Sequence, residues 1–414
     1  MFRRSILVVF ASAAIGSGAL AQSNRIDVVT PTAPELAAYG SFAIGVRTLQ
    51  VTDRNRPDIL NIKEGGPILR YDRTLTLEIW YPATLAAGQK PGGDYRAITR
   101  DPTISATLHG QAVRDAGPMT VARFPLVIIS HGYPGNRFLM SHLAENLASK
   151  GFVAVSIDHK DSTYDDQKAF ASTLYNRPFD QLFVLDEMDR LSKAGSGSFL
   201  SGLLDASRTG IVGYSMGGYG VVNVVGGGYS KASETIAGAP PNRLLADRGA
   251  ANPARTTDAR IKAAIAIAPW GMAGGFWDAD GLKGVTTPVL FVAGSIDDVA
   301  GYEKGTKAIY QAAVNADRYL LTFINANHNA AAPIPAPAET YVAAEQGKPA
   351  AFAHYADAVW DTVRMNNILD HFATAYFDLY LKNDEEKKTY FEGWKGFKRG
   401  TTAGLTLDHA APGR

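Results

Sequence analysis

Residues 210–218 read Gly-Ile-Val-Gly-Tyr-Ser-Met-Gly-Gly, and this stretch decides the fold. The apolar run up to Tyr214 predicts a buried strand, and the residues after Ser215 have the pattern of a helix. Between them lies a G-x-S-x-G pentapeptide, in which a serine occupies a sharp and strained turn from strand to helix. Glycines suit this turn because a strand and a helix that cross so closely leave no room for a Cβ atom. We therefore predict that Ser215 is a nucleophile presented at the end of a strand.

A serine becomes a useful nucleophile when a histidine takes its proton and a carboxylate orients that histidine. In chains with this turn the order along the sequence is serine, acid, histidine. Asp297 follows a predicted strand at 288–293, and His328 follows another at 319–324. The carboxyl ends of parallel strands meet at one edge of a sheet, which is the edge expected for Ser215. The sequence therefore predicts a triad of Ser215, Asp297 and His328.

Two other residues compete for these roles. His159 also follows a predicted strand, but it precedes the serine in the sequence, so His328 is preferred as the base. Asp298 adjoins Asp297, and a position at a strand end does not separate the two carboxylates. Five further histidines fit surface or packing roles in helical patterns, polar segments or a loop, and they are His109, His142, His354, His371 and His409.

Serine chemistry also requires two backbone N–H donors for the oxyanion of the intermediate. One donor is expected from Met216, the residue after the nucleophile. The other is expected from the loop after an earlier strand, and the turn-rich residues 131–135 follow the predicted strand at 124–130. We therefore expect the amides of Tyr133 and Met216 to form the oxyanion hole.

Segments rich in apolar and β-branched residues predict eight strands, and helical patterns lie between them at 139–150, 179–193 and 302–315. Pro178 is expected at the start of the second helix. The central strands are apolar without alternation, as is typical of parallel strands buried on both faces. The pattern predicts an α/β fold with a mainly parallel eight-stranded sheet and helices on both faces. The eight expected strands are 44–51, 75–81, 124–130, 152–157, 210–214, 261–268, 288–293 and 319–324.

Three stretches depart from this alternation. Residues 226–260 are rich in Gly, Ala, Ser and Pro and are longer than an ordinary connection, so we expect an inserted lid or pocket rim. Residues 351–381 have apolar residues at helical spacing and are expected to pack on the same core. Residues 391–414 are expected to be a C-terminal tail. One catalytic domain is thus expected over 22–390.

Residues 1–21 have the pattern of a cleaved signal peptide: a short basic start, an apolar stretch and Ala19-Leu20-Ala21 as a small-x-small cleavage site. An uncleaved anchor would need about 20 apolar residues, and this stretch is shorter and contains glycines. We therefore expect a mature chain that starts near Gln22, has no membrane span and is periplasmic or secreted.

The composition excludes several classes of chemistry. Lys and Arg number 41 and Asp and Glu number 40, so the net charge of +1 gives no electrostatic drive toward nucleic acid. The chain has no cysteine, which excludes disulfides, cysteine zinc sites and a thiol nucleophile. It also lacks a zinc motif, a P-loop and a dinucleotide fingerprint. No metal and no other cofactor is expected.

The sequence resembles the α/β-hydrolase superfamily over about residues 39–381, and within it a bacterial group similar to platelet-activating-factor acetylhydrolases and often described as predicted dienelactone hydrolases. A second resemblance is to cutinases and polyester hydrolases, through GYSMGG, the Tyr133 loop and Ala268-Pro269-Trp270. True dienelactone hydrolases use a cysteine nucleophile, which this chain lacks. The first resemblance rests on Gly45–Thr48, Ile79–Pro82, Ser130–Tyr133, Asp158–Asp161, Arg177–Asp180 and Gly213–Gly218.

The resemblance implies a secreted serine esterase, and it assigns His159 to a structural motif at a strand end. It also places the acid as the fourth residue of a G-x-x-D turn, which gives Asp297 when counted from Gly294. Trp270 and Trp277 are expected near the substrate pocket, although a core position suits Trp270 equally well.

The leading hypothesis is hydrolysis of small-molecule or polymeric carboxylic esters through an acyl-enzyme. An amidase or peptidase with the same triad and a catalytically silent binding protein of the same fold are the alternatives.

Overall fold

A computed structural model of the chain describes residues 23–245, 257–344 and 350–414, and its centre is a mixed sheet of 11 strands within that part of the chain. Six neighbouring strands run parallel, and the middle of the sheet is buried on both faces. They are β7 (Phe124–Ser130), β8 (Val153–Asp158), β9 (Leu204–Tyr214), β10 (Ile261–Ile267), β11 (Val289–Gly294) and β12 (Arg318–Phe323). The sheet order is β13-β12-β11-β10-β9-β7-β8-β2-β1-β5, with β6 paired to β2.

The prediction of an α/β fold with a mainly parallel sheet is confirmed, and the predicted count of eight strands is wrong. All eight expected strands are present, including the antiparallel pair β1 (Ala43–Pro57) and β2 (Arg70–Thr84). The sheet gains the short strands β5 (Val113–Arg114) and β6 (Gly117–Pro118), which are too short to leave a pattern in the sequence. A separate two-stranded sheet joins β3 (Gly93–Ile98) to β4 (Ser105–Gly110), so His109 lies in a strand rather than in the expected loop.

The C-terminal segment is not the loose tail that its composition suggested. Its last strand, β13 (Leu405–Ala410), pairs antiparallel with β12 and closes one edge of the sheet. His409 stacks on Tyr319 with ring centroids 4.4 Å apart, and its Nε2 lies 2.8 Å from an oxygen of Asp317. Only one side of this strand packs on the protein, so its sequence stays polar and resembles a solvated segment.

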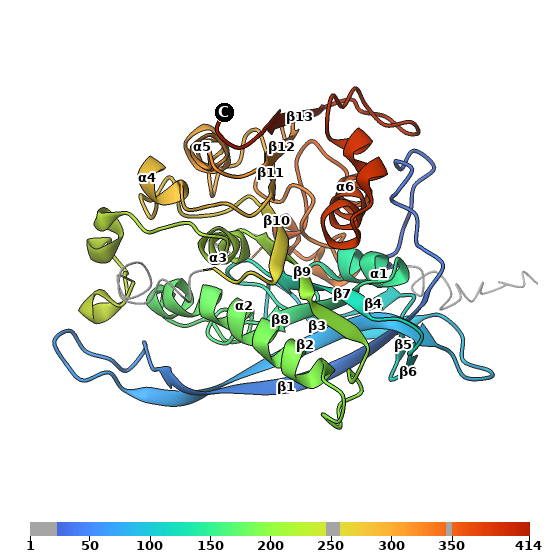
Figure 1. Ribbon diagram of the computed structural model, residues 1–414, viewed down its shortest axis with the longest axis horizontal. Coiled ribbons are helices and arrows are strands. Elements are labelled where there is room, and N and C mark those ends of the chain that lie inside the picture. The colour runs from blue at the N-terminus through green and yellow to red at the C-terminus, as the bar shows by residue number, and fades with distance from the viewer. Residues whose placement is uncertain (1–22, 246–256, 345–349) are drawn as a thin grey trace, which may run out of the picture.

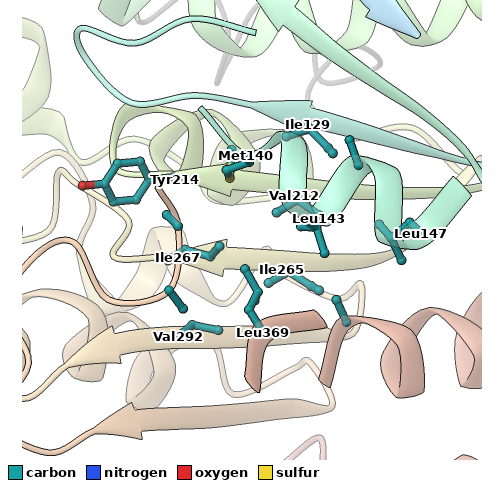
Figure 2. Packing of buried hydrophobic residues seen from close by; sticks show 14 of the residues in the cluster. Ile129, Met140, Leu143, Leu147, Val212, Tyr214, Ile265, Ile267, Val292 and Leu369 are labelled. Carbon is teal, nitrogen blue, oxygen red and sulfur yellow. The ribbon is translucent and has the colours of Figure 1, made fainter. Parts of the chain in front are cut away.

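Helices cover both faces of the sheet, as expected (Figure 1). Helices α1 (Ser141–Ser149) and α6 (Thr362–Lys382) pack on one face, and Figure 2 shows their leucines against the apolar side chains of the central strands. On the other face lie α2 (Phe170–Ser192), α3 (Met216–Val224), α4 (Ala279–Leu282) and α5 (Lys307–Ala312). A π-helical turn, η6 (Tyr302–Thr306), leads into α5, where one continuous helix was expected.

Pro178 does not start its helix, contrary to expectation, because α2 already begins at Phe170. The residues of α2 from 172 to 177, which directly precede the proline, are buried against the rest of the molecule. Tertiary packing therefore holds the first turns of the helix and outweighs the local preference of proline for a helix start.

The part of the expected lid that the structure describes, 226–245 and 257–260, contains the short turns η2 (Lys231–Thr235) and η3 (Pro241–Arg243). This segment is tied to the tip of the β1–β2 hairpin, since the amide of Gly65 donates to Asn242 Oδ1 at 2.7 Å. Residues 246–256 of the expected lid and the expected signal peptide lie outside the described residues. The remaining 3₁₀ turns are η7 (Ala338–Thr340), η8 (Ala351–His354) and η9 (Glu385–Tyr390). None of the described helices has the length and apolar character needed to cross a membrane.

Candidate active site

Ser215 occupies the turn between β9 and α3 in a strained backbone conformation, with φ 53° and ψ −113°. Neighbouring backbone groups hold this turn: the Ser215 amide donates to the Ile267 carbonyl at 2.9 Å, and the Ser215 carbonyl accepts from the Tyr219 amide at 2.9 Å. A Cβ atom on Gly217 would overlap the carbonyl oxygen of Ser130 at the end of β7. The glycine thus allows the helix to start directly against the sheet, which leaves the serine at its carboxyl edge.

The side chains of Ser215, His328 and Asp297 form a continuous hydrogen-bonded chain. Ser215 Oγ lies 2.9 Å from His328 Nε2, and His328 Nδ1 lies 3.0 Å from each carboxylate oxygen of Asp297. Relative exposures of 7%, 8% and 7% for Ser215, His328 and Asp297 show that the chain is largely shielded from water. Asp298, the neighbouring carboxylate, is exposed and makes no contact with the imidazole.

Asp297 is held in place by the backbone as well as by the imidazole. Its Oδ1 accepts the amides of Val299 and Ala300, both at 2.9 Å. Burial favours a raised pKa for Asp297, but the hydrogen bond and charge of His328 and the two backbone amides outweigh it and lower the pKa. The carboxylate is therefore ionised at neutral pH and accepts hydrogen bonds only.

The expected oxyanion loop lies directly against the serine. A Cβ atom on Gly132 would be 3.3 Å from the Ser215 Cβ, so the loop after β7 and the turn after β9 are in van der Waals contact. Within the described residues, the amides of Tyr133 and Met216 have no hydrogen-bond acceptor. Two unpaired N–H groups beside a serine hydroxyl are what an oxyanion site requires.

Arg177, in α2, contacts this loop through its guanidinium group. The sequence does not predict it as a site residue. Its guanidinium donates to the carbonyls of His131 and Gly132 and to Ser162 Oγ, the last at 2.8 Å. Burial lowers the pKa of Arg177 to about 9. The only sequence signal was its place in the Arg-Pro-Phe-Asp run, which does not reveal that its partners are backbone carbonyls.

His159 does not contact Ser215. It is 1% exposed, and its two nitrogens face Ser130 Oγ at 2.8 Å and Asp180 Oδ2 at 3.0 Å. Burial and the charge of Arg177 lower the pKa of His159 to about 3, so the imidazole is neutral. Within the described ranges, no group of three or more His, Asp or Glu side chains is arranged to hold a metal ion.

The two tryptophans expected at the pocket have different surroundings. Trp270 is partly exposed, and its ring packs against Phe170, which in turn packs against Tyr133, with centroids 5.2 and 5.1 Å apart. Trp277 is 2% exposed and donates from Nε1 to Asn223 Oδ1 at 3.1 Å. The ring of Trp277 is part of the core behind α3, and the expectation that it lies near the substrate pocket stays a prediction.

Residues 99–241 match a family model described as PETase, PET hydrolase-like. Cutinase est1 of Thermobifida alba is 26% identical over 203 residues, which are 49% of this chain and 52% of that protein. Cutinase 1 of Thermobifida cellulosilytica is 25% identical over 190 residues, 44% of this chain and 52% of that protein. The chain thus spans about half the length of the curated relatives it matches.

A solved structure of a ferulic acid esterase from Streptomyces cinnamoneus has a similar fold. The TM-score is 0.56 at 19% sequence identity, and the match covers 94% of this chain and 99% of that one. The fold is therefore that of the esterase, and the sequence likeness is to cutinases and PET hydrolases. The protein has an α/β-hydrolase fold and resembles the cutinases and polyester hydrolases among the serine esterases of that fold.

Proposed function

We propose that this protein hydrolyses carboxylic esters through an acyl-enzyme intermediate on Ser215. The observation that carries the proposal is the hydrogen-bonded chain from Ser215 Oγ through His328 to Asp297, with distances of 2.9 and 3.0 Å. The likeness to cutinases and to a PET hydrolase family supports an ester as the substrate.

The proposed reaction follows from the atoms at each end of this chain. His328 Nε2 takes the hydroxyl proton as Ser215 Oγ attacks the ester carbonyl, and Asp297 keeps the other ring proton on Nδ1. The amides of Tyr133 and Met216 then donate to the oxyanion. The alcohol leaves with the proton from His328, and a water molecule releases the acid by the same steps in reverse order.

The substrate is proposed to place a flat or apolar group against the aromatic row of Tyr133, Phe170 and Trp270. These partly exposed rings contact one another edge to face next to the expected oxyanion loop, and aromatic side chains favour contact with planar groups. The similar proteins are described as cutinases, a PET hydrolase family and a ferulic acid esterase, and these names refer to aromatic or polymeric substrates. We infer an ester with an aromatic or short apolar portion, as a small molecule or within a polymer.

The domain organisation and location belong to the same proposal. We infer a signal peptide over 1–21, a hydrolase domain that begins near residue 22 and extends past the expected end at residue 390 to include β13, and a periplasmic or secreted mature protein. The described parts of the 226–260 insertion, 226–245 and 257–260, are proposed to form a rim that covers part of the pocket, and the hydrogen bonds of Asn242 to Gly65 and Gly66 of the β1–β2 hairpin support a fixed position for this rim.

The test is the variant Ser215→Ala, compared with Ser141→Ala as a matched control. Ser141 is a buried serine whose hydroxyl has no partner among the described residues, so its loss should leave activity unchanged. Ser215→Ala should turn over a p-nitrophenyl ester at less than about a hundredth of the wild-type rate and should not react with a fluorophosphonate probe. A faster rate would place the nucleophile elsewhere.

The same assay separates the two alternatives. An ester and an amide of matched acyl group distinguish an esterase from an amidase, since both would use the same groups. A wild-type protein that neither turns over esters nor reacts with the probe would instead be a binding protein of this fold.

A further inference from the structure

Tyr214, the residue before the nucleophile, lies between the two loops that flank Ser215. Its ring packs on the imidazole of His328, with centroids 5.1 Å apart and an interplanar angle of 36°. The same ring lies beside the other loop, because a Cβ atom added to Gly132 would be only 3.2 Å from it. Tyr214 is 2% exposed, so one buried side chain lies next to both the base and the oxyanion loop.

The hydroxyl of Tyr214 extends this contact to the residue after the base. It donates to Asn329 Oδ1 at 3.0 Å. Burial and the charges of Asp297 and Asp298 raise the pKa of Tyr214, so the phenol keeps its proton and acts as a donor. The ring thus contacts His328 and the hydroxyl holds its neighbour.

Asn329 is itself fixed to a third segment of the chain. Its Nδ2 donates to the carbonyls of Ala353 and Ala356 at 2.9 and 2.8 Å, and its backbone amide donates to Asn327 Oδ1 at 2.8 Å. Because both hydrogens of Nδ2 have carbonyl acceptors, the orientation of the amide is determined and its oxygen must face Tyr214. Asn329 therefore ties the loop after β12 to the segment that precedes α6.

We propose that Tyr214 and Asn329 are positioning residues that hold the imidazole of His328 in line with Ser215 and Asp297. The proposal rests on the proposed function, because it gives them a role only if His328 is the base. The loop that carries His328 has left the sheet, so sheet hydrogen bonds do not fix it. Tyr214, the residue before the nucleophile, and Asn329, the residue after the base, instead restrict the position of this loop.

The physical reason is the short range of proton transfer. His328 Nε2 must lie in line with Ser215 Oγ to take its proton, and a misplacement of about 1 Å can lower the rate about 10²-fold. Loss of the phenol hydroxyl leaves the ring in place and frees only the tie to Asn329. We therefore expect a smaller loss than that, with substrate binding preserved because neither residue forms part of the aromatic row.

The test compares Tyr214→Phe, Asn329→Ala and the double variant in ester hydrolysis, with Tyr81→Phe as the control. Tyr81 is fully buried in β2 and donates to the Ala116 carbonyl at 2.7 Å, so its variant loses a comparable buried hydrogen bond away from the site. We expect Tyr214→Phe to lower kcat by about 5- to 20-fold with KM unchanged within about twofold, and Tyr81→Phe to leave both constants unchanged.

A double-mutant cycle tests whether the two residues act together. If they act through their shared hydrogen bond, the double variant should lose no more kcat than Asn329→Ala alone, and independent losses that multiply would contradict the proposal. Denaturant midpoints of all variants show whether a loss in kcat exceeds the effect of reduced stability. A Tyr214→Phe enzyme with wild-type kcat, while Ser215→Ala is inactive, would overturn the positioning role and leave the proposed function intact. An active Ser215→Ala variant would overturn both.

Discussion

Replacing Asp297 with asparagine should abolish almost all activity while preserving the shape of the site. The prediction follows from which oxygen of Asp297 bonds to which donor. Oδ1 accepts the amides of Val299 and Ala300 at 2.9 Å each, so an asparagine must place its carbonyl oxygen there. Its NH₂ group then occupies the position of Oδ2, 3.0 Å from His328 Nδ1.

This placement favours the wrong tautomer of the histidine. Oδ1 also lies 3.0 Å from Nδ1, but it already accepts two backbone amides, and an Nδ1–H would face the hydrogens of the NH₂ group. A hydrogen bond from the NH₂ group to Nδ1 instead places the ring proton on Nε2, the atom that must accept the proton of Ser215. The equivalent change in serine hydrolase triads lowers kcat by about 10⁴-fold, which corresponds to about 5.4 kcal/mol of transition-state stabilisation at about 1.36 kcal/mol per tenfold. We expect a loss of that size in Asp297→Asn.

The assay is steady-state hydrolysis of a p-nitrophenyl ester at neutral pH, with Asp298→Asn as the matched control. Asp298 has the same charge and adjoins Asp297 in the chain, but its side chain is exposed and does not reach the imidazole. Asp298→Asn should therefore remain close to the wild-type rate. If Asp298→Asn is the inactive variant and Asp297→Asn is active, the assignment of the acid is wrong.

Two further predictions concern stability. Asp180→Asn should lower the free energy of unfolding, measured by urea titration, by about 3–5 kcal/mol, because it leaves the buried Arg73 guanidinium without its main partner. Burial opposes ionisation of Asp180, but Arg73 and the other partners of this carboxylate lower its pKa. The stabilisation by Asp180 is therefore present at neutral pH and is lost as the pH falls below about 4. If the variant loses stability in acid just as the wild type does, this prediction is contradicted. Gly217→Ala should lower the free energy of unfolding by about 1–3 kcal/mol and remove most of the activity, because its Cβ overlaps the Ser130 carbonyl. In Gly117→Ala the added Cβ makes only an ordinary contact, 3.6 Å from the Thr84 carbonyl oxygen, so this control should melt like the wild type.

The sequence contained enough information for the parallel core of the fold. Strands buried on both faces are uniformly apolar, and all six parallel strands were found in this way. The missed strands have a different environment: β13 packs on one side only, and β3 and β4 alternate buried and exposed residues over six positions each. A short strand with one exposed face contains many polar residues, as a loop does. Its pairing with a neighbouring strand, and not its own composition, therefore shows that it is a strand.

For the candidate site, the sequence placed serine, acid and histidine at strand ends, and the structure brings Ser215, Asp297 and His328 into hydrogen-bond contact. Their catalytic roles, and those of the two amide donors, stay predictions. A tryptophan near a site in the sequence can face either the pocket or the core, and Trp277 is buried in the core. Only its packing behind α3 distinguishes the two.

What the sequence determined by itself is therefore local: a glycine-flanked serine between a strand and a helix, and an acid and a histidine that each follow a strand. These patterns are set by backbone geometry within a few residues. The tertiary structure shows that Asp297, which the G-x-x-D turn favours, bonds to the imidazole, and it alone decided that Arg177 holds the oxyanion loop and that Tyr214 reaches Asn329. These contacts join residues 31 to 115 positions apart, and their partners are loops and carbonyl groups whose positions are fixed only when the sheet and its helices pack together.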